Sequence, residues 1–390
     1  MAIIALTAPP CHADALDVVN VVAGVSSKYD DNLFRLPSGQ DTSALTGRTE
    51  RGDRVLTSFA GLRVDQPYSL QRFKLDLTWT AYRFQNFDYL DFDAKEYRAA
   101  WLWSLTSYLK GTLSADRKQQ LNDFRDYRSY TAANIRTTEN RVFDADWSPH
   151  GNWHLLAGFR QMEQTNSQVF NEDADVKVNG VNAGLKYQFP SGSSVTWMTT
   201  LRQGQFTKRA LNAGSLLDTG YDERESEARL EWLASERSRF NLRTSHLDRT
   251  HDHFDQRDFN GWTGRLEYMW SPSAKLRLNA SAAREFASYQ TTESSYSQND
   301  SVGLALGYEV SPKVKVNLNG SLYERRYLGD GVVSNIGRVD TGSSVMLGAD
   351  WTPLRSLKFS ASVQQNRRQA NVAGADFEGS IAEVSAQILF

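Results

Sequence analysis

The sequence predicts a membrane-spanning, antiparallel, up-and-down β-barrel of about 18 strands, or of 16 strands if the first pair is irregular. The prediction depends on alternating apolar and polar residues, on tight turns that recur about every 40 residues, and on the end of the chain. There, Val384, Ala386, Ile388 and Phe390 share one strand face. Such an apolar edge promotes aggregation in a soluble protein, whereas a closed barrel has no edge and turns its apolar face to lipid.

The composition of the chain fits strands that meet lipid at every second residue. Hydrophobic residues make up 40% and aromatic residues 12% of the 390 positions, and no run approaches the roughly 18 consecutive apolar residues of a membrane helix. A soluble β-solenoid or propeller has a similar composition, so the repeat period decides. The net charge of −2 gives no nucleic-acid signature, and Cys11, the one cysteine, excludes a disulfide framework.

The N-terminal residues resemble the end of a secretory signal peptide. Residues 2–8 are mostly apolar, and residues 13–15 read Ala-Asp-Ala, an A-x-A cleavage pattern. We therefore expect residues 1–15 to be a residual signal peptide and residues 16–390 to form the barrel. A disordered N-terminus is one alternative, and a lipoprotein is another, which Pro9 and Pro10 before Cys11 disfavour.

A second pattern is an aromatic or branched residue followed by a tight Ser, Pro or Gly turn, which recurs at intervals of 38 to 44 residues. Four propeller strands per repeat would average about ten residues each, and the alternating runs are longer. Two strands of roughly 12 residues, one short turn and one longer loop fit better. The aromatic residues before the turns predict a girdle at one membrane interface: Trp103, Trp147, Phe189, Trp232, Trp270 and Trp351.

Each repeat contains segments with one apolar face. In residues 73–81, apolar residues from Phe73 to Ala81 interleave with polar ones, and the same alternation recurs in 181–189, 275–282, 302–310, 314–322 and 357–364. Arg141 is an exception, because it falls on the face of Phe143 and Trp147. A lipid-facing arginine at mid-depth costs about 2–4 kcal/mol, so we expect a bulge or a rim position there.

The short turns alternate with longer polar segments such as 30–52, 84–94, 116–130 and 207–221. In barrels of the bacterial outer membrane the short turns are periplasmic and the longer loops extracellular, which places both termini in the periplasm. None of these loops is an obvious candidate for a constriction folded into the barrel.

The polar strand faces predict a charged lumen. Acids concentrate around residues 225–231, whereas Arg243, Arg265 and Arg277 on successive strands predict a lateral basic patch. One interpretation is a structural ladder of salt bridges between strands, and the other is a channel that selects an anionic or hydroxyl-rich solute. The candidate path residues are Arg98, Lys110, Arg160, Lys186, Arg202, Arg229, Arg243, Arg265, Arg277, Glu225, Glu227 and Glu267.

No motif for catalysis or cofactor binding stands out. The sequence has no G-x-S-x-G, no H-E-x-x-H and no glycine-rich phosphate loop. Residues 251–255 (His-Asp-His-Phe-Asp) look like metal ligands, but their turn propensity favours a solvated loop. We expect no enzyme, no metal and no cofactor, although a barrel hydrolase or protease could assemble a site from scattered Ser, His and Asp residues.

One short motif carries a family resemblance. Residues 29–35 (Tyr-Asp-Asp-Asn-Leu-Phe-Arg), at the end of the first predicted strand, resemble EpsL-type barrels encoded with exopolysaccharide genes, and the broader β-barrel porin 2 group. That resemblance implies an export path for an extracellular polysaccharide. The strand count is also similar to that of the alginate-export barrel, but the mixed lumen argues against a purely polyanionic substrate. The terminal Phe390 resembles the last residue that the barrel-assembly machinery reads in outer-membrane barrels.

Three hypotheses follow for a barrel of the Gram-negative outer membrane. The first is export of an exopolysaccharide of the biofilm matrix, the second is a general or small-solute porin, and the third is a plugged structural or adhesion barrel. The expected partners are the polysaccharide, outer-membrane lipid, the barrel-assembly machinery and periplasmic polysaccharide-export components, with no nucleic acid.

Overall fold

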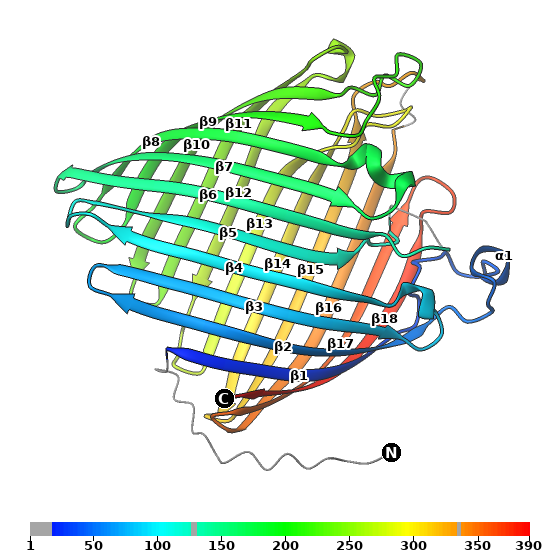
Figure 1. Cartoon of the computed structure of the whole chain (residues 1–390), viewed down its shortest axis with the longest axis horizontal. Helices are drawn as coiled ribbons and strands as arrows, with labels where there is room; N and C mark the ends of the chain where they lie inside the picture. The colour runs from blue at the N-terminus through cyan, green and yellow to red at the C-terminus, as the bar shows by residue number, and fades with distance from the viewer. Residues whose placement is uncertain (1–17, 126–130, 334–336) are drawn as a thin grey trace.

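The computed structural model describes residues 18–125, 131–333 and 337–390, which form a closed barrel (Figure 1). The expected signal peptide and Cys11 lie outside the described residues. Eighteen antiparallel strands each pair with their neighbours in sequence, and the first strand also pairs with the last. The predicted fold class and the count of 18 strands are therefore confirmed.

The strands are 12 to 16 residues long, enough to cross a bilayer at the tilt of a barrel strand. Short 3-10 turns and one short helix lie in the longer loops: α1 (Ser43–Thr46), η1 (Asp88–Leu90), η2 (Val169–Ala174) and η3 (Asp255–Arg257). No helix in the described part of the chain is long and apolar enough to cross a membrane. The strands are β1 (Val19–Asp30), β2 (Asp53–Tyr68), β3 (Gln71–Phe84), β4 (Phe92–Ser104), β5 (Leu109–Leu121), β6 (Ile135–His150), β7 (Trp153–Asn166), β8 (Val176–Gln188), β9 (Ser194–Phe206), β10 (Gly220–Ser235), β11 (Ser238–His251), β12 (Phe259–Trp270), β13 (Leu276–Ser288), β14 (Tyr296–Ser311), β15 (Val314–Leu328), β16 (Val339–Leu354), β17 (Leu357–Ala370) and β18 (Phe377–Leu389).

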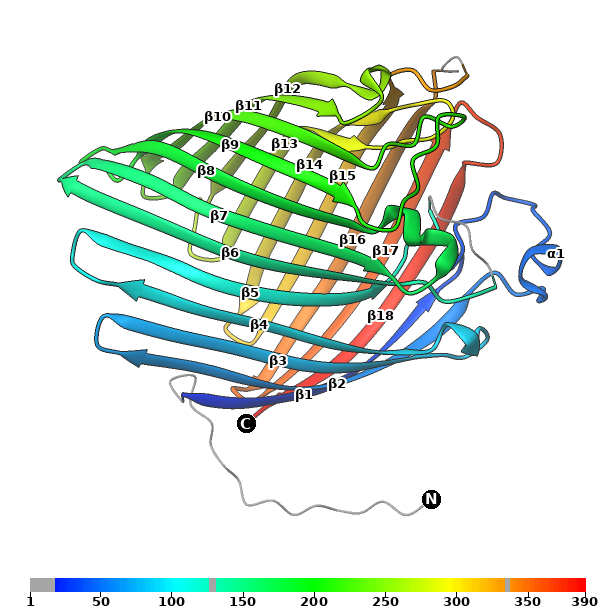
Figure 2. The ribbon, with the colours of Figure 1, turned by 45° about the horizontal axis from the view of Figure 1, so that its top comes forward.

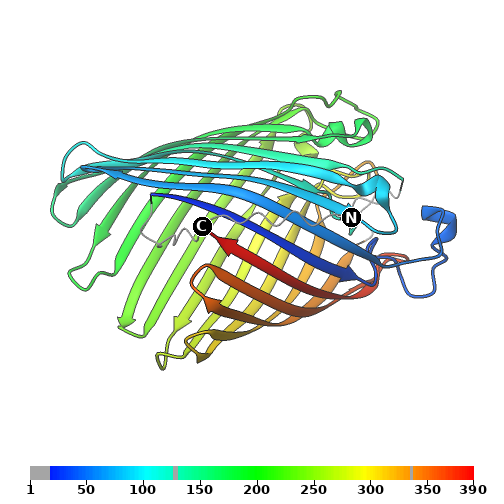
Figure 3. The ribbon, with the colours of Figure 1, turned by 60° about the horizontal axis from the view of Figure 1, so that its bottom comes forward.

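Closure depends on the pairing of β1 with β18, which lie side by side in Figure 3. Their register runs from Val22 opposite Leu389 to Asp30 opposite Ile381. At the periplasmic end, Phe390 and Val21 exchange two backbone hydrogen bonds of 2.8 and 2.9 Å. Because lipid offers no hydrogen-bond partner, this pairing satisfies backbone groups that an open sheet would leave unpaired.

The short turns lie at one end of the barrel and the longer loops, with α1, at the other (Figure 2). Four hairpins shift register just before the short turn, at Trp147/His150, Leu233/Ser235, Glu309/Ser311 and Trp351/Leu354. Three of these shifts coincide with a Ser-Pro or Thr-Pro step. Proline has no backbone N–H to donate, so the regular ladder stops there and the chain turns.

The aromatic residues before these turns lie on the outward face. Trp147, Phe189, Trp232, Trp270 and Trp351 are all exposed in the absence of lipid. Trp103 differs, because only 8% of it is exposed. It faces Gly111 across the strand pair, whose missing side chain lets the indole lie flat, 5.9 Å from the Phe143 ring and nearly parallel to it.

Arg141 occupies a rim position without a bulge. It pairs regularly with Gln161, whose side-chain oxygen accepts its hydrogen bond at 2.8 Å, and it lies 3.7 Å from Glu139. The outward residues from Phe143 to Trp147 are apolar, and the next three towards the long loops, Arg141, Glu139 and Thr137, are polar. The expected bulge is therefore wrong, and the rim position is correct.

The backbone exchange with Val21 places Phe390 at the seam and predicts its effect on assembly. Deleting Phe390, or replacing it with Asp, should sharply reduce folded barrel in the outer membrane, because the closing pair loses its end and a charge enters the lipid interface. Heat-modifiable migration on gels measures the folded fraction. Val169→Asp, an exposed loop change, should leave it unaltered, and normal folding of the Phe390 variants would refute the prediction.

Candidate functional site

The lumen is the candidate functional site, because strand alternation directs the charged candidates inward. On β4 and β5, Arg98 and Lys110 alternate with lipid-facing Trp101 and Leu113. The same holds for Arg160, Lys186 and Arg202 on β7 to β9, for Glu225, Glu227 and Arg229 on β10, and for Arg243, Arg265, Glu267 and Arg277 on β11 to β13.

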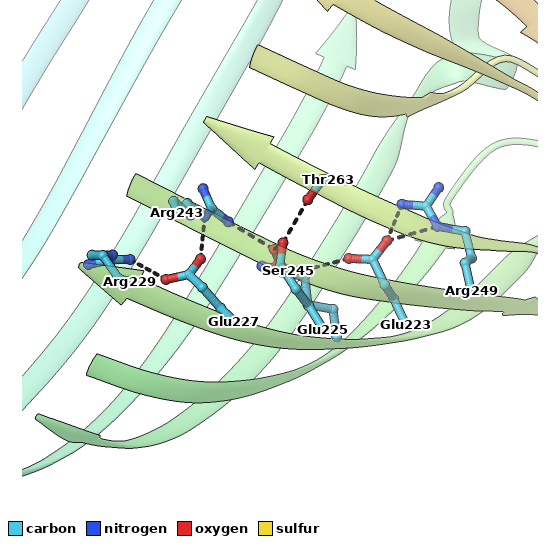
Figure 4. A network of polar contacts seen from close by, with 9 residues as sticks. Glu223, Glu225, Glu227, Arg229, Arg243, Ser245, Arg249 and Thr263 are labelled. Carbon is cyan, nitrogen blue, oxygen red and sulfur yellow. Dashed lines mark hydrogen bonds and ion pairs between the residues drawn. The ribbon is translucent and has the colours of Figure 1, made fainter. Parts of the chain in front are cut away.

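The acids of β10 form the centre of the charged wall. Glu223, Glu225 and Glu227 stand at every second position of the strand, and Figure 4 shows them extending towards Arg243, Ser245 and Arg249 of β11. Although they line a wide barrel, they are only 6%, 5% and 6% exposed. A buried carboxylate is costly unless cations and hydrogen-bond donors surround it.

Arginines from both neighbouring strands supply those partners. Arg202 donates to Glu223 at 2.5 Å and to Glu225 at 2.6 Å. Arg243 donates to Glu225 at 2.9 Å and also contacts Glu227. The remaining contacts follow the same pattern: Arg249 binds Glu223, Arg229 binds Glu227, and the Ser245 hydroxyl donates to Glu225 at 2.7 Å.

The two kinds of charge are not equally accessible. The side chains of Arg229 and Arg243 remain 41% and 46% exposed, while the glutamates that they contact are covered. A solute moving along this wall therefore meets guanidinium groups before carboxylates. We call the set Glu223, Glu225, Glu227, Arg202, Arg229, Arg243 and Arg249 the β10 charge wall.

The expected lateral basic patch is only partly present. Arg243 lies directly opposite Arg265 on the paired strands β11 and β12. Arg277 belongs elsewhere, because the β13 residue opposite Arg265 is Ala283, six positions away. It lies 3.4 Å from Glu309, and Arg265 donates to Glu285 at 2.6 Å and lies 3.8 Å from Glu267. The prediction of a three-arginine patch is wrong because alternation fixes the face of a strand but not its register.

The remaining candidates line the wall from β4 to β8. Arg160 lies 3.8 Å from Asp144, and Arg98 stands opposite Asp76 and Asp116 on its two neighbouring strands. Lys110 stands opposite Asp146, whose carboxylate lies 2.7 Å from His154. Lys186 neighbours His154 and Thr196. Cations beside or opposite carboxylates thus line the lumen from β4 to β8.

Residues of three loops pack together at the mouth of the barrel, which the sequence did not indicate. Loop 1 (residues 31–52), loop 2 (85–91) and loop 3 (described at 122–125 and 131–134) share a buried apolar cluster with Val55 and Phe84, at the long-loop ends of β2 and β3. Phe34, with no exposed surface, packs edge-on against Phe87 at 4.8 Å and against Phe124 at 4.7 Å. Burial beside this cluster raises the pKa of Tyr89 to about 12.

Loop 3 also reaches strands on another part of the wall. The backbone carbonyl of Arg125 accepts a 3.0 Å hydrogen bond from the guanidinium of Arg368 on β17. Five strands, β4, β3, β2, β1 and β18, separate β5 from β17 around the barrel. Arg125 and Arg368 both lie over the ring of Phe377 on β18, at 5.9 and 5.1 Å. Phe124 and Arg125 therefore lie inside the mouth, although the sequence offered no obvious candidate for an inward loop.

The motif that carried the family resemblance fastens loop 1 to the seam. Arg35 binds both carboxylate oxygens of Asp30 at 2.7 Å. Burial alone would lower the pKa of Arg35, but this pair offsets burial and raises it above its usual value. The Asn32 amide donates to the carbonyls of Leu36 and Glu378, at 2.8 and 2.7 Å, which joins loop 1 to β18. The motif thus has a structural role here.

The histidine-rich segment 251–255 joins two loops. His251 is buried and lies 3.2 Å from Asp258, so a simple solvated loop is the wrong description at that position. Asp218, Asp252 and His253 could approach one cation. However, both oxygens of buried Asp218 already accept hydrogen bonds from the backbone of His253, Phe254 and neighbouring residues. We assign the cluster to loop anchoring.

Comparisons with known proteins show a likeness of fold to solved outer-membrane barrels. No family model matches, and no curated protein matches by sequence. The solved outer membrane protein OpdK from Pseudomonas aeruginosa matches with a TM-score of 0.52 and 10% identity, over 95% of this chain and 99% of that one. OccK9 (OpdG) from the same organism matches with a TM-score of 0.50 and 10% identity, over 95% and 98%.

The class of this protein follows from the fold and these likenesses. The closed barrel with an apolar outer band and a charged lumen is an integral β-barrel of the Gram-negative outer membrane. The comparisons support an outer-membrane barrel but not the narrower EpsL-type group. At 10% identity the likeness defines the fold and not the solute.

The burial of Glu225 predicts a large effect on stability. Glu225→Gln leaves Arg202 and Arg243 short of a counter-charge, and breaking a buried ion pair costs about 3–5 kcal/mol. Denaturant unfolding in detergent should show this loss. Glu285→Gln removes the partner of Arg265 at an exposed position, where a pair contributes about 0–1 kcal/mol. Equal effects of the two variants would argue against the β10 charge wall as a buried network.

Proposed function

We propose that this protein is a porin-type channel that passes small solutes and favours anions. The observation that carries the proposal is the β10 charge wall, where covered glutamates fix the positions of accessible guanidinium groups. Guanidinium groups offer paired donors that suit carboxylates and other oxyanions. Stabilisation of the barrel alone would not require these guanidinium groups to be accessible from the lumen.

The apolar cluster in the mouth favours a channel for small solutes over a channel for a polymer. Phe34, Phe87 and Phe124 form an apolar obstacle at the inner edge of the loops, and loop 3 extends towards β17. A polysaccharide in export would have to pass this obstacle as a continuous chain. OpdK, a barrel of the same fold, has been solved with vanillate, a small organic molecule. Export of an exopolysaccharide is therefore the less supported hypothesis, and a porin is preferred.

Ion selectivity tests the role of the lumen arginines. The triple variant R243Q/R265Q/R277Q should shift the reversal potential in a salt gradient towards cations, with the anion-to-cation permeability ratio falling at least about twofold. Planar bilayers with purified protein give this measurement, and thermal unfolding of the same variant reports on stability. Arg284→Gln removes an arginine from the outer face and should leave the ratio unchanged.

The outcomes separate the hypotheses. Lower thermal stability with an unaltered permeability ratio would make these arginines a structural ladder only. Absence of any conductance in the wild-type protein would favour the plugged barrel over a channel.

The mouth cluster predicts the effect of loop packing on conductance. The double variant F34A/F124A removes two rings from a fully buried cluster and should increase single-channel conductance and admit larger neutral polymers. Partition of polyethylene glycols of graded size measures the change. Phe170→Ala, at an exposed ring of η2, is the matched control. If both variants conduct as the wild type does, the cluster does not limit passage.

A further inference from the structure

The outer wall carries an apolar groove with a cationic upper end. The groove, about 500 Å³ in volume, lies across β1 to β5 and is lined on the lipid side by Val21, Ala60, Leu62, Leu77 and Trp79. Its extracellular end is formed by Lys95, Glu96, Tyr97 and Arg117.

The depth of this end follows from the strand direction. β4 begins at the long-loop end with Phe92, so Lys95 lies near the extracellular side, directly opposite Trp79. Trp79 and Tyr97 are residues typical of the membrane interface. The apolar residues of the groove lie deeper, where acyl chains run. The cationic end of the groove therefore lies at the depth of lipid headgroups, and its apolar part lies at the depth of acyl chains.

The two cations at this end differ in how far the protein neutralises them. Lys95 is exposed, and within the described residues its ammonium group has no hydrogen bond or ion pair. The Nε of Arg117 lies 3.6 Å from a carboxylate oxygen of Glu139, which is an ion pair but is too long for a hydrogen bond. Among the described residues, Lys95 is therefore the open cation of the groove, and Arg117 has one long ion pair.

A second groove on the opposite wall gives a contrast. It has a volume of about 780 Å³ and is lined on the lipid side by residues such as Leu242, Trp262 and Val302. Its upper end carries Arg284, which binds both carboxylate oxygens of Asp300 at 2.6 and 2.9 Å. Because this cation is already neutralised, the second groove has apolar shape without free charge.

We propose that the groove of β1 to β5 binds a phosphorylated glycolipid of the outer leaflet, of the lipid A type. An acyl chain lies along Leu62, Leu77 and Trp79, and a phosphate accepts hydrogen bonds from Lys95 and Arg117. Clusters of basic residues at a membrane surface bind anionic headgroups, and charged donors bind phosphate strongly. The site is independent of what passes through the lumen.

Native mass spectrometry of the purified, full-length folded barrel tests the proposal. The probes are bis-phosphorylated lipid A, the same lipid without phosphates, and phosphatidylglycerol. The wild type should retain one tightly bound bis-phosphorylated lipid A, and K95Q/R117Q should bind it at least about tenfold more weakly. Arg284→Gln should bind it as the wild type does. Heat-modifiable migration confirms that each variant is folded.

The outcomes are decisive in either direction. If the double variant fails to fold, K95Q alone should still weaken binding, because the Lys95 ammonium group has no hydrogen bond or ion pair within the described protein. Equal binding of lipid A by the wild type and K95Q would overturn the proposal. So would equal retention of the dephosphorylated lipid, and phosphatidylglycerol bound as tightly as lipid A would exclude a site built for the glycolipid.

Discussion

Pairing of β1 with β18 is the constraint on which the rest of this structure depends. In lipid, each backbone N–H and C=O must find its partner within the sheet, so the first and last strands have to meet in one register. Phe390 and Val21 close the periplasmic end of this seam, and Asn32 secures the extracellular end through the carbonyl of Glu378. The outer grooves, the charged lumen and the mouth all follow from that closed wall.

In the closed barrel, each strand has one face in lipid and the other face in the lumen. Outward residues such as Leu77 and Val384 require no partner beyond lipid, whereas inward charges need counter-charges in a confined, partly dry space. The β10 charge wall meets this need by covering its acids and leaving its arginines accessible. Under the proposed function, stabilisation and selectivity share the same contacts, because the ion pairs that hold the glutamates also fix the accessible guanidinium groups.

Much of this architecture was predictable from period-2 alternation and the turn repeat, because both are local properties of the chain. The residues that escaped prediction depend on register or on tertiary contact. Arg277 lies apart from Arg265 since strand offset cannot be derived from alternation. Phe34 and Phe124 looked like isolated rings in polar loops, and only the closed barrel brings them together. Trp103 lies flat because Gly111, on the neighbouring strand, leaves room.

The sequence positions of the charge wall and of the mouth contacts have a consequence for the order of folding. All ion pairs of the β10 charge wall join residues between Arg202 and Arg249, on three consecutive strands. Contacts of short sequence separation form early, because little chain entropy is lost. The bond from Arg368 to Arg125 spans 243 residues. An unfinished barrel thus acquires its charged surface and the apolar cluster of its mouth first, and Arg125 gains its contacts with Arg368 and Phe377 only when the C-terminal strands arrive.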